Sequence, residues 1–334
     1  MLGALYKPGI YDLVIEKHHP VPRPSKGEVL LKVAASGVCH SDVTWLSGIA
    51  KDERKFIMGH EVCGTPVELG LEVDSEEIKL GKLYSVYLFN SCAEAMAGTT
   101  VVGVGIDGGF APYVVVAANQ LLEVPENVPV EVAAIAADAG ITAYHAVHDT
   151  AGIKPGTNYR VLIFGIGGLG HLAVQFAKHY GATVYACDIK PEARELALEL
   201  GAAEAFDLIE MDQKIKDGFT VDITIDFVAN SLTFANAFGA LTGNLTSRST
   251  SPKLVLIGIS SETFTASELN LVTSNVSVLG STYGSRDNGK VVLDLFSKGA
   301  VRPIVKTEPL ENVQKVINEL RASQYVGRKV LLPK

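Results

Sequence analysis

The sequence predicts an α/β fold in which a β-rich region is followed by a doubly wound parallel sheet. From about residue 161, short apolar segments alternate with helical segments over about 120 residues, which is typical of such a sheet. Before that point, turn residues separate the candidate strands. The chain has 334 residues, 47% of them hydrophobic, which is enough for two domains that each bury a core.

The first region contains three candidate strands, at 28–35, 83–89 and 113–117. Prolines and glycines lie between them, among them the pair Gly108-Gly109, and these residues favour turns. This part of the chain is therefore predicted to be β-rich.

The second region begins with the apolar run 161–164, a predicted buried strand. A helical stripe follows and stops at Gly181, and 183–187 forms the next strand. The helix after it has Pro191 near its first turn and Gly201 after its end, the asymmetry that helices favour. Further strands are expected at 222–228, 253–257 and 276–280. The tail from about residue 284 predicts one more amphipathic helix, with apolar positions Val313, Val316, Ile317 and Leu320.

Composition excludes several classes of partner. The formal net charge of −8 gives no electrostatic footprint for nucleic acid or an anionic membrane. The N-terminal residues lack a signal-peptide pattern, and the longest apolar runs, near 114–118 and 132–137, are too short to cross a bilayer. Four scattered cysteines do not make a disulfide framework, so we expect a cytoplasmic protein.

A glycine-rich motif, Gly-x-Gly-x-x-Gly at 165–170, lies between the predicted strand 161–164 and the following helix. In this context the first glycine permits the turn, the second lets the backbone approach a pyrophosphate, and the third packs helix on strand. The helix N-terminus then presents N–H groups to the anion. A tight turn without a ligand is the alternative. The predicted cofactor-binding residues here are Gly165, Gly167, Gly168, Leu169 and Gly170.

Asp188 closes the second strand of this region, where a carboxylate accepts hydrogen bonds from the adenosine ribose hydroxyls. Its charge repels a 2′-phosphate, so NAD is favoured over NADP. The alternative is a helix-cap residue before Pro191.

Three segments carry groups that ligate metals: Cys39, His60 and Asp138. Asp138 interrupts an apolar stretch that should be buried, and a buried carboxylate needs a strong partner. A helix N-terminus or an arginine would serve, but a divalent metal fits better. A thiolate, an imidazole and a carboxylate leave the fourth position open, which is typical of a catalytic zinc site. Asp42 and Glu61 would orient the imidazole and tune the field of the metal, with Glu61 also a candidate replacement ligand.

With these motifs in place, the sequence resembles the zinc-containing medium-chain alcohol dehydrogenases over nearly its whole length. The similar segments are 37–42, 59–61, 107–116, 138–147, 161–170, Asp188, 256–258, 280–286 and 325–331. The resemblance implies a GroES-like catalytic domain at 1–139 and 283–334 and a Rossmann NAD-binding domain at 140–282. It implies reversible hydride transfer between NAD(H) and an alcohol or its ketone or aldehyde, with one catalytic Zn²⁺ per chain.

The same resemblance implies roles for three further residues. His40 is expected near the cofactor pyrophosphate, Arg328 near the phosphates, and Ser41 on the substrate oxygen, where it passes a proton. The alternative for Ser41 is a cap on a helix starting near Asp42. A homodimer or homotetramer is also expected.

Three departures from the family pattern matter. Asp138 stands where most members have a cysteine, which is similar to certain microbial carbonyl reductases and favours secondary alcohols. The segment 82–107 is short and contains only Cys92, so no structural zinc is expected. Thr44 replaces a histidine that relays protons to solvent, so the last proton step must use water or another group.

Two other functions were weighed. One is a zinc-free enone or quinone reductase of the same superfamily, which needs none of the three ligands, so metal content separates it from the first hypothesis. The other is a non-catalytic NAD(H)-binding protein, which the fold alone does not exclude. A sensor needs only the glycine-rich turn, and the ligand set together with Ser41 argues against it.

Overall fold

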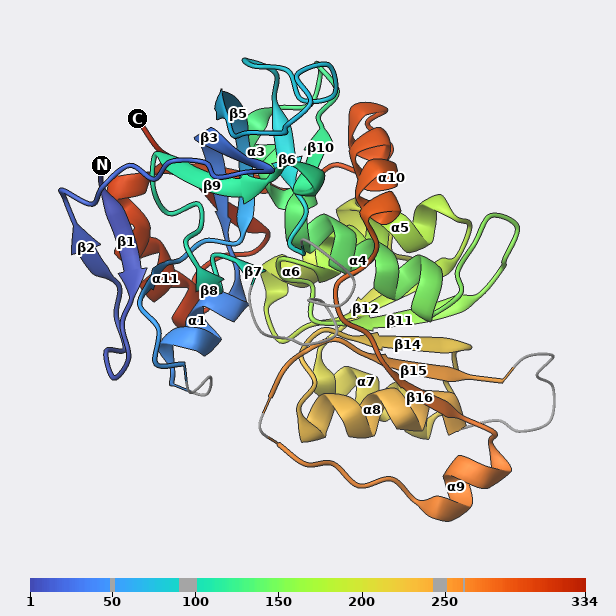
Figure 1. Cartoon of the computed structure of the whole chain (residues 1–334). Helices are drawn as coiled ribbons and strands as arrows, with labels where there is room; N and C mark the ends of the chain where they lie inside the picture. The colour runs from blue at the N-terminus through green and yellow to red at the C-terminus, as the bar shows by residue number, and fades with distance from the viewer. Residues whose placement is uncertain (49–51, 90–100, 243–250, 261) are drawn as a thin grey trace. The chain divides into compact units, whose positions relative to one another are not determined.

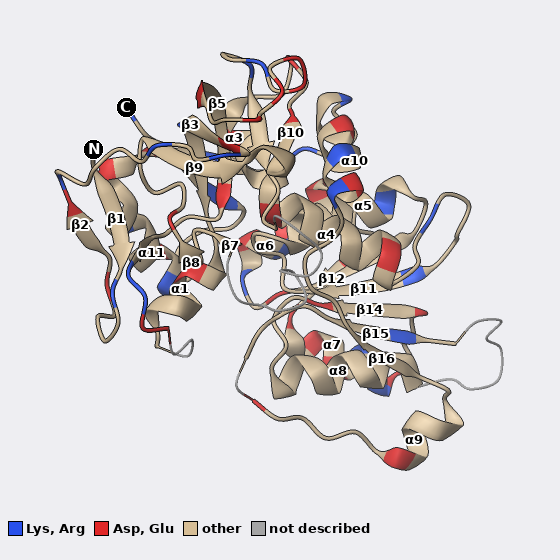
Figure 2. Ribbon diagram, in the orientation of Figure 1, with Lys and Arg blue, Asp and Glu red and all other residues tan. Residues whose placement is uncertain are grey.

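The computed structural model describes residues 1–48, 52–89, 101–242, 251–260 and 262–334. The chain forms two compact units, which are described one at a time (Figure 1). Unit 1 comprises Met1–Gly140, Gly289–Lys298 and Pro303–Lys334, and unit 2 comprises Ile141–Asn288 and Gly299–Arg302. Acidic and basic residues are interspersed along the ribbon of both units (Figure 2).

Unit 1 is β-rich, as predicted, and the strands expected at 28–35 and 113–117 are present, whereas the strand expected at 83–89 is shorter, Tyr84–Val86. A small antiparallel sheet has the order β2 (Val14–Glu16), β1 (Gly3–Tyr6), β4 (Phe56–Ile57). The larger sheet of the described residues has the order β10-β6-β5-β3-β18-β17, and β9 also pairs with β3. Its strands are β3 (Glu28–Val38), β5 (Glu61–Leu69), β6 (Tyr84–Val86), β9 (Tyr113–Ala117), β10 (Leu121–Glu123), β17 (Val305–Pro309) and β18 (Arg328–Leu332). A short parallel pair joins β7 (Val101–Val102) and β8 (Gly105–Ile106).

The core of unit 1 fixes the place where β3 runs into α1 (His40–Leu46). Val38 and Leu46 are buried in one apolar cluster with the inner face of α11 (Val313–Arg321). Such burial contributes about 1.5–3 kcal/mol for each large aliphatic side chain, which holds the strand–helix junction in one conformation.

A long apolar helical segment, Val130–Thr150, crosses the end of unit 1 into the residues of unit 2. It consists of α3 (Val130–Ile135), the π-helical turn η2 (Ala136–Gly140), α4 (Ile141–His145) and a second π-helical turn, η3 (Ala146–Thr150). The apolar run at 132–137 was expected to be too short to cross a membrane. It is part of a 21-residue helical segment that is long and apolar enough to do so by length and composition alone. Because 72% of its most apolar window is buried inside the structure, it has the character of a core helix.

Unit 2 is built on a parallel sheet with the order β13-β12-β11-β14-β15-β16. The strands are β11 (Arg160–Phe164), β12 (Thr183–Cys187), β13 (Glu204–Phe206), β14 (Ile223–Asp226), β15 (Lys253–Leu256) and β16 (Ser277–Gly280). The helices are α5 (Gly170–His179), α6 (Pro191–Glu199), α7 (Leu208–Lys216), α8 (Ser231–Thr242) and α9 (Glu268–Thr273). β11 is the first strand of this sheet in the chain. β12 and β13 follow on one side of it and β14, β15 and β16 on the other, so the strand order reverses between β11 and β14. The predicted doubly wound parallel sheet is confirmed.

The tail differs from the prediction of a single helix, because α10 (Arg286–Ser297) precedes α11. Gly284 and Gly289 obscure its start in the sequence. A reciprocal cap was the available signal: Ser285 Oγ accepts from the Asn288 N–H and Asn288 Oδ1 accepts from the Ser285 N–H, at 3.1 and 2.7 Å.

Candidate functional site

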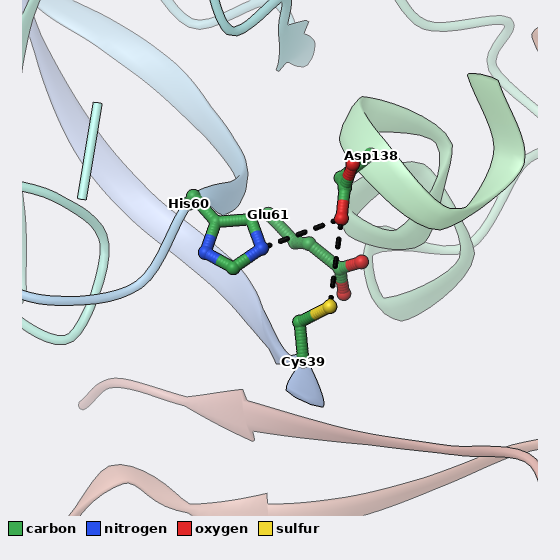
Figure 3. Close-up of side chains that lie close together, drawn as sticks. All are labelled: Cys39, His60, Glu61 and Asp138. Carbon is green, nitrogen blue, oxygen red and sulfur yellow. Dashed lines mark hydrogen bonds and ion pairs between the residues drawn. The ribbon is translucent and has the colours of Figure 1, made fainter. Parts of the chain in front are cut away.

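Four side chains from three separate segments of unit 1 converge on one point (Figure 3): Cys39, His60, Glu61 and Asp138. One ligand atom from each lies within 4.8 Å of all the others. The structure therefore brings together the three residues that the sequence suggested as metal ligands, and it adds Glu61 to the same cluster.

Local structure sets the position of each of the three. Cys39 is the residue between β3 and α1, and its backbone is extended. His60 directly precedes β5 and follows Gly59, whose φ is +95°. Asp138 lies in the middle of the π-helical turn η2. Single π-turns are frequent at functional sites, because the extra residue shifts one side chain off the regular helical face.

The spacing of the three groups matches tetrahedral coordination. Cys39 Sγ lies 3.6 Å from Asp138 Oδ2, and His60 Nε2 lies 3.3 Å from the same oxygen. With ordinary zinc bond lengths, a tetrahedral site places sulfur and oxygen roughly 3.5 Å apart and nitrogen and oxygen roughly 3.3 Å apart. Both distances are therefore those expected between ligands of one zinc ion.

The charges of the cluster also suit a cation. Among the described residues, neither ring nitrogen of His60 has a hydrogen-bond partner, although the ring is 3% exposed. Burial lowers the pKa of His60, but the carboxylates of Asp42 and Asp138 and the side chain of Cys39 outweigh it, so the pKa stands well above its usual range. Without a metal the imidazole holds a proton against this excess of negative charge. A divalent cation would replace that proton.

Asp42 links two of the predicted ligands. It is fully buried, and its Oδ2 accepts a hydrogen bond from the Cys39 N–H at 2.9 Å. Its other oxygen lies 3.2 Å from His60 Nδ1. The predicted role of Asp42 in orienting the imidazole is consistent with this geometry, and the bond to Cys39 is an additional contact.

Glu61 belongs to the cluster and has three close neighbours. Its Oε1 accepts from the Ala139 N–H at 3.1 Å and forms an ion pair with the Arg328 guanidinium. Its Oε2 lies over the backbone of Gly37, where a Cβ atom would be 1.9 Å from this oxygen. Burial raises the pKa of Glu61, and the Arg328 charge opposes that effect. Glu61 thus fixes the amide next to Asp138 through Oε1, while its Oε2 has no hydrogen-bond partner among the described residues, so its role as a metal ligand or as a support stays a prediction.

Arg328 is buried, with its guanidinium directed at Glu61. Sequence reasoning placed it near the cofactor phosphates, which stays a prediction. His40 begins α1 and is exposed, and its expected contact with the pyrophosphate also stays a prediction. Cys92 and part of the segment 82–107 lie outside the described residues.

The hydroxyl of Ser41 lies 3.7 Å from Cys39 Sγ. The alternative role, a cap for a helix starting near Asp42, does not agree with the structure. α1 begins at His40, its N-cap residue is Cys39, and Asp42 supplies the side-chain bond to the cap backbone. The Thr44 hydroxyl donates to the His40 carbonyl at 3.1 Å and is thus bonded within the helix.

The glycine-rich turn of unit 2 joins β11 to α5, as predicted, with Leu169 as the N-cap residue and Gly170 at the helix start. A Cβ atom on Gly170 would lie 1.8 Å from the Gly165 carbonyl oxygen, so the third glycine of the motif is required by packing. A Cβ atom on Gly167 would meet nothing within 4 Å. Gly167 therefore lies where a ligand can approach the backbone closely.

Asp188 directly follows β12 and is bonded to this turn. Its Oδ2 accepts from the Ile166 N–H at 2.7 Å, and its Oδ1 accepts from the Lys190 N–H at 2.9 Å. The N-cap residue of α6 is Lys190, so Asp188 is not the cap of that helix. Arg194 donates to the backbone carbonyls of Asp188 and Ile189, at 2.9 and 3.1 Å.

His171 is a residue of this site that sequence reasoning missed. It is fully buried in α5, and its Nδ1 lies 2.8 Å from the Gly167 carbonyl, to which Nδ1–H donates in the matching tautomer. The signal in the sequence was a polar residue one position after the last glycine, in a helix that is otherwise buried.

A β-rich unit with a metal cluster and a parallel-sheet unit with a dinucleotide turn define a metal-dependent dehydrogenase. Residues 25–126 match the alcohol dehydrogenase GroES-like domain, and residues 168–298 match the zinc-binding dehydrogenase domain. An alcohol dehydrogenase of Geobacillus stearothermophilus is 35% identical over 93% of both chains.

Solved structures show the same relationship. The acetophenone reductase of Geotrichum candidum, in complex with NAD, has a TM-score of 0.86 at 32% identity and covers 99% of this chain and 96% of its own. The alcohol dehydrogenase of Aeropyrum pernix has a TM-score of 0.87 at 28% identity over 100% of both chains. The chain belongs to the zinc-type medium-chain alcohol dehydrogenase family. It is an oxidoreductase, an NAD(H)-dependent alcohol dehydrogenase or carbonyl reductase with Zn²⁺ as its metal.

We predict that Asp138→Ala loses zinc and activity together. Removal of a ligand leaves Cys39 and His60 with too few donors, and zinc affinity should fall by at least about 10²-fold, since even a supporting contact is worth up to that much. Metal analysis after dialysis against a weak chelator measures this. Asp138→Cys, which restores an anionic ligand, is the matched control and should keep its zinc. An alanine variant that retains one zinc per chain would show that Asp138 is not a ligand.

We predict at least about tenfold discrimination in favour of NADH over NADPH, equal to roughly 1.4 kcal/mol, from the charge of Asp188. Asp188→Ser should narrow the gap. It should also lower stability, because two backbone amides lose their acceptor. The ratio of kcat/KM for the two cofactors measures the first effect and the melting temperature the second. Equal efficiency of the wild type with NADPH would contradict the assignment.

Proposed function

We propose that the protein interconverts a secondary alcohol and its ketone, with NAD(H) as hydride carrier, at one zinc ion held by Cys39, His60 and Asp138. The observation that carries this proposal is the spacing of the ligand atoms: Cys39 Sγ and His60 Nε2 lie 3.6 and 3.3 Å from Asp138 Oδ2. The ketone is favoured over an aldehyde because Asp138 stands where most relatives have a cysteine, and a relative that is 32% identical bears the name acetophenone reductase.

When bound, zinc supplies a Lewis acid for the substrate oxygen. The chain's own residues hold and orient it. The Cys39 thiolate, the Asp138 carboxylate and neutral His60 provide the donors, and Asp42 and Glu61 hold the backbone at two of them. Because these supports are buried and hydrogen-bonded, the ligands need little reorganisation during the reaction.

Ser41 is proposed to exchange the proton of the substrate oxygen. Its hydroxyl lies beside Cys39 Sγ, and its place as cap is taken by Cys39 and Asp42. From there the proton must leave through water or another group, because the Thr44 hydroxyl does not titrate and is bonded to the His40 carbonyl.

The division of labour follows the two units. We propose that 1–139 with 283–334 is the catalytic domain and that 140–282 is the domain that binds NAD(H). The boundary between units 1 and 2 after Gly140 supports the first domain boundary. The second boundary lies later than proposed, because unit 2 extends to Asn288 and also includes Gly299–Arg302. On the cofactor side, the residues proposed are Gly165, Gly167, Gly168, Leu169, Gly170 and Asp188, together with His40 and Arg328. The scattered cysteines, of which Cys39, Cys63 and Cys187 are free, support a cytoplasmic location.

The proposed reaction is tested by NADH oxidation with matched ketones, aldehydes and enones, before and after removal of zinc. Ketone turnover that is lost on removal and restored by zinc supports the proposal. Turnover of enones that needs no metal would instead indicate the zinc-free reductase. NADH binding without any turnover would indicate a binding protein.

We predict that Ser41→Ala lowers kcat by about 10²-fold or more, the scale of lost acid–base assistance. Zinc content and the dissociation constant for NADH should stay unchanged. The melting temperature should also change little, because Ser41 is not the helix cap. Ser41→Thr, which keeps the hydroxyl, is the control and should retain most of the activity. Unchanged turnover in the alanine variant would refute the proposed proton transfer.

We propose a homodimer formed through the edge of the unit 2 sheet. β16 is the last strand at one edge of the sheet. The helix that precedes it in the chain, α9, has no buried residue. Leu269 and Val272 on α9 are 70% and 71% exposed. Residues 263–285 carry a single charge, Glu268, and their ribbon is tan elsewhere in Figure 2. A strand edge that pairs with no further described strand, together with exposed apolar residues on the preceding helix, favours pairing with a second copy.

Size-exclusion chromatography with light scattering, which measures the mass of the protein in solution, checks this proposal. The wild type should have twice the chain mass, or four times if two dimers associate. Leu269→Asp combined with Val272→Asp should give the monomer. Ile209→Asp on α7 is the matched control, because Ile209 is 82% exposed but lies away from β16 in the sheet order. A monomeric wild type, or a double variant that keeps the mass of the wild type, would contradict the proposed interface.

A further inference from the structure

Asp226 is a fully buried carboxylate at the carboxyl end of β14. It is not among the metal-binding, catalytic or cofactor-binding residues named above. It pairs in register with Phe164, the last residue of β11, so it lies beside the start of the glycine-rich turn. β11 and β14 are the two strands between which the strand order reverses. In open α/β sheets, ligands bind outside the carboxyl ends of the strands at such a reversal.

The Asp226 side chain holds the loop that follows its own strand. Oδ1 accepts from the N–H groups of Val228 and Ala229, both at 2.9 Å. Its main-chain carbonyl accepts from the Ile257 N–H at 2.9 Å, in the segment that follows β15. One residue thus anchors the backbone after two neighbouring strands.

The loop is packed tightly against its neighbours at Val228. A Cβ atom on Gly165 would lie 2.7 Å from Val228 Cγ2, and a Cβ atom on Gly258 would lie 2.5 Å from the Val228 carbonyl carbon. Loops following β11, β14 and β15 therefore meet at this residue. The Val228 side chain is nevertheless 40% exposed, which leaves an apolar surface next to the glycine-rich turn.

The loop conformation needs this support. Ala229 has a φ of +53°, in the left-handed region that residues with a Cβ atom disfavour. Such a conformation persists only where surrounding contacts fix it, and the two hydrogen bonds to Asp226 Oδ1 are contacts of that kind. Burial raises the pKa of Asp226, which the amides of Ala229 and Val228 and the Thr233 hydroxyl oppose.

We propose that Asp226 is a positioning residue for NAD(H): it fixes the turn at Val228–Ala229 so that Val228 forms an apolar contact surface for the dinucleotide beside Gly165. The inference rests on the proposed binding of NAD(H) at this edge and adds two residues to it. Asp226 acts through hydrogen bonds to the loop backbone, so an acceptor atom is required there and a charge is not.

The test is the dissociation constant for NADH, measured by fluorescence titration, in three variants of the full-length protein. Asp226→Ala should weaken binding by about tenfold, as expected when the acceptor of two hydrogen bonds is lost. Asp226→Asn keeps an oxygen that accepts from both amides and should bind within about twofold of the wild type. Asp222→Ala is the matched control, since Asp222 Oδ2 accepts from the Arg160 N–H at 2.8 Å at the opposite end of the sheet.

The control should lower the melting temperature and leave NADH affinity unchanged. In steady-state kinetics, Asp226→Ala should raise KM for NADH with kcat nearly unchanged and zinc content unaltered. Gly258→Ala gives an independent test if the alanine variant fails to fold, because its Cβ displaces Val228 while Asp226 stays intact. It should weaken NADH binding in the same direction.

The outcomes separate the inference from the function on which it rests. Wild-type protein that does not bind NADH would overturn both. Wild-type protein that binds NADH, with Asp226→Ala or Gly258→Ala binding equally tightly, would overturn the inference and leave the proposed function standing. A loss of affinity in Asp222→Ala as large as in Asp226→Ala would also overturn it, since the effect would then be general destabilisation.

Discussion

The metal cluster depends on negative charge buried in one small region of unit 1. Cys39, Asp42, Glu61 and Asp138 all lie within the same group of contacts, and a single arginine, Arg328, is paired with them. Each buried ion costs several kcal/mol, on the order expected for incomplete compensation in a protein interior. The carboxylates around His60 raise its pKa well above the usual range although burial opposes this, and the same negative charge favours a bound cation.

Both units use carboxylates in the same way, as acceptors for the backbone amides next to a functional residue. Asp42 accepts from the Cys39 N–H, and Glu61 accepts from the Ala139 N–H beside Asp138. In unit 2, Asp188 accepts from Ile166 in the glycine-rich turn. A hydrogen bond from an amide to a carboxylate is about twice as strong as one between neutral groups, so these contacts fix loop backbone where sheet or helix pairing is absent.

Much of the fold was predictable because its signals are local. The apolar runs of the parallel sheet and the turn residues of the β-rich region lie within a few residues of the strands they specify, and the expected strands are present. The helix α10 was missed, since glycines at its start weaken the local pattern. The apolar segment around Asp138 indicated a buried carboxylate, but its π-helical turn has no signal in residue types, because the extra residue is imposed by packing around it.

The sequence by itself determined which groups are available: three ligand types in three separate segments, a glycine motif between strand and helix, and an aspartate after the next strand. These are properties of residue identity and of short-range order. Only the tertiary structure decided that Cys39 and His60 lie close enough to Asp138 for all three to bind one metal ion. It also decided that Glu61 pairs with Arg328 and packs on the backbone of Gly37. Such contacts join residues far apart in the chain, and their distances follow from how the strands pair and the core packs, which no local pattern records.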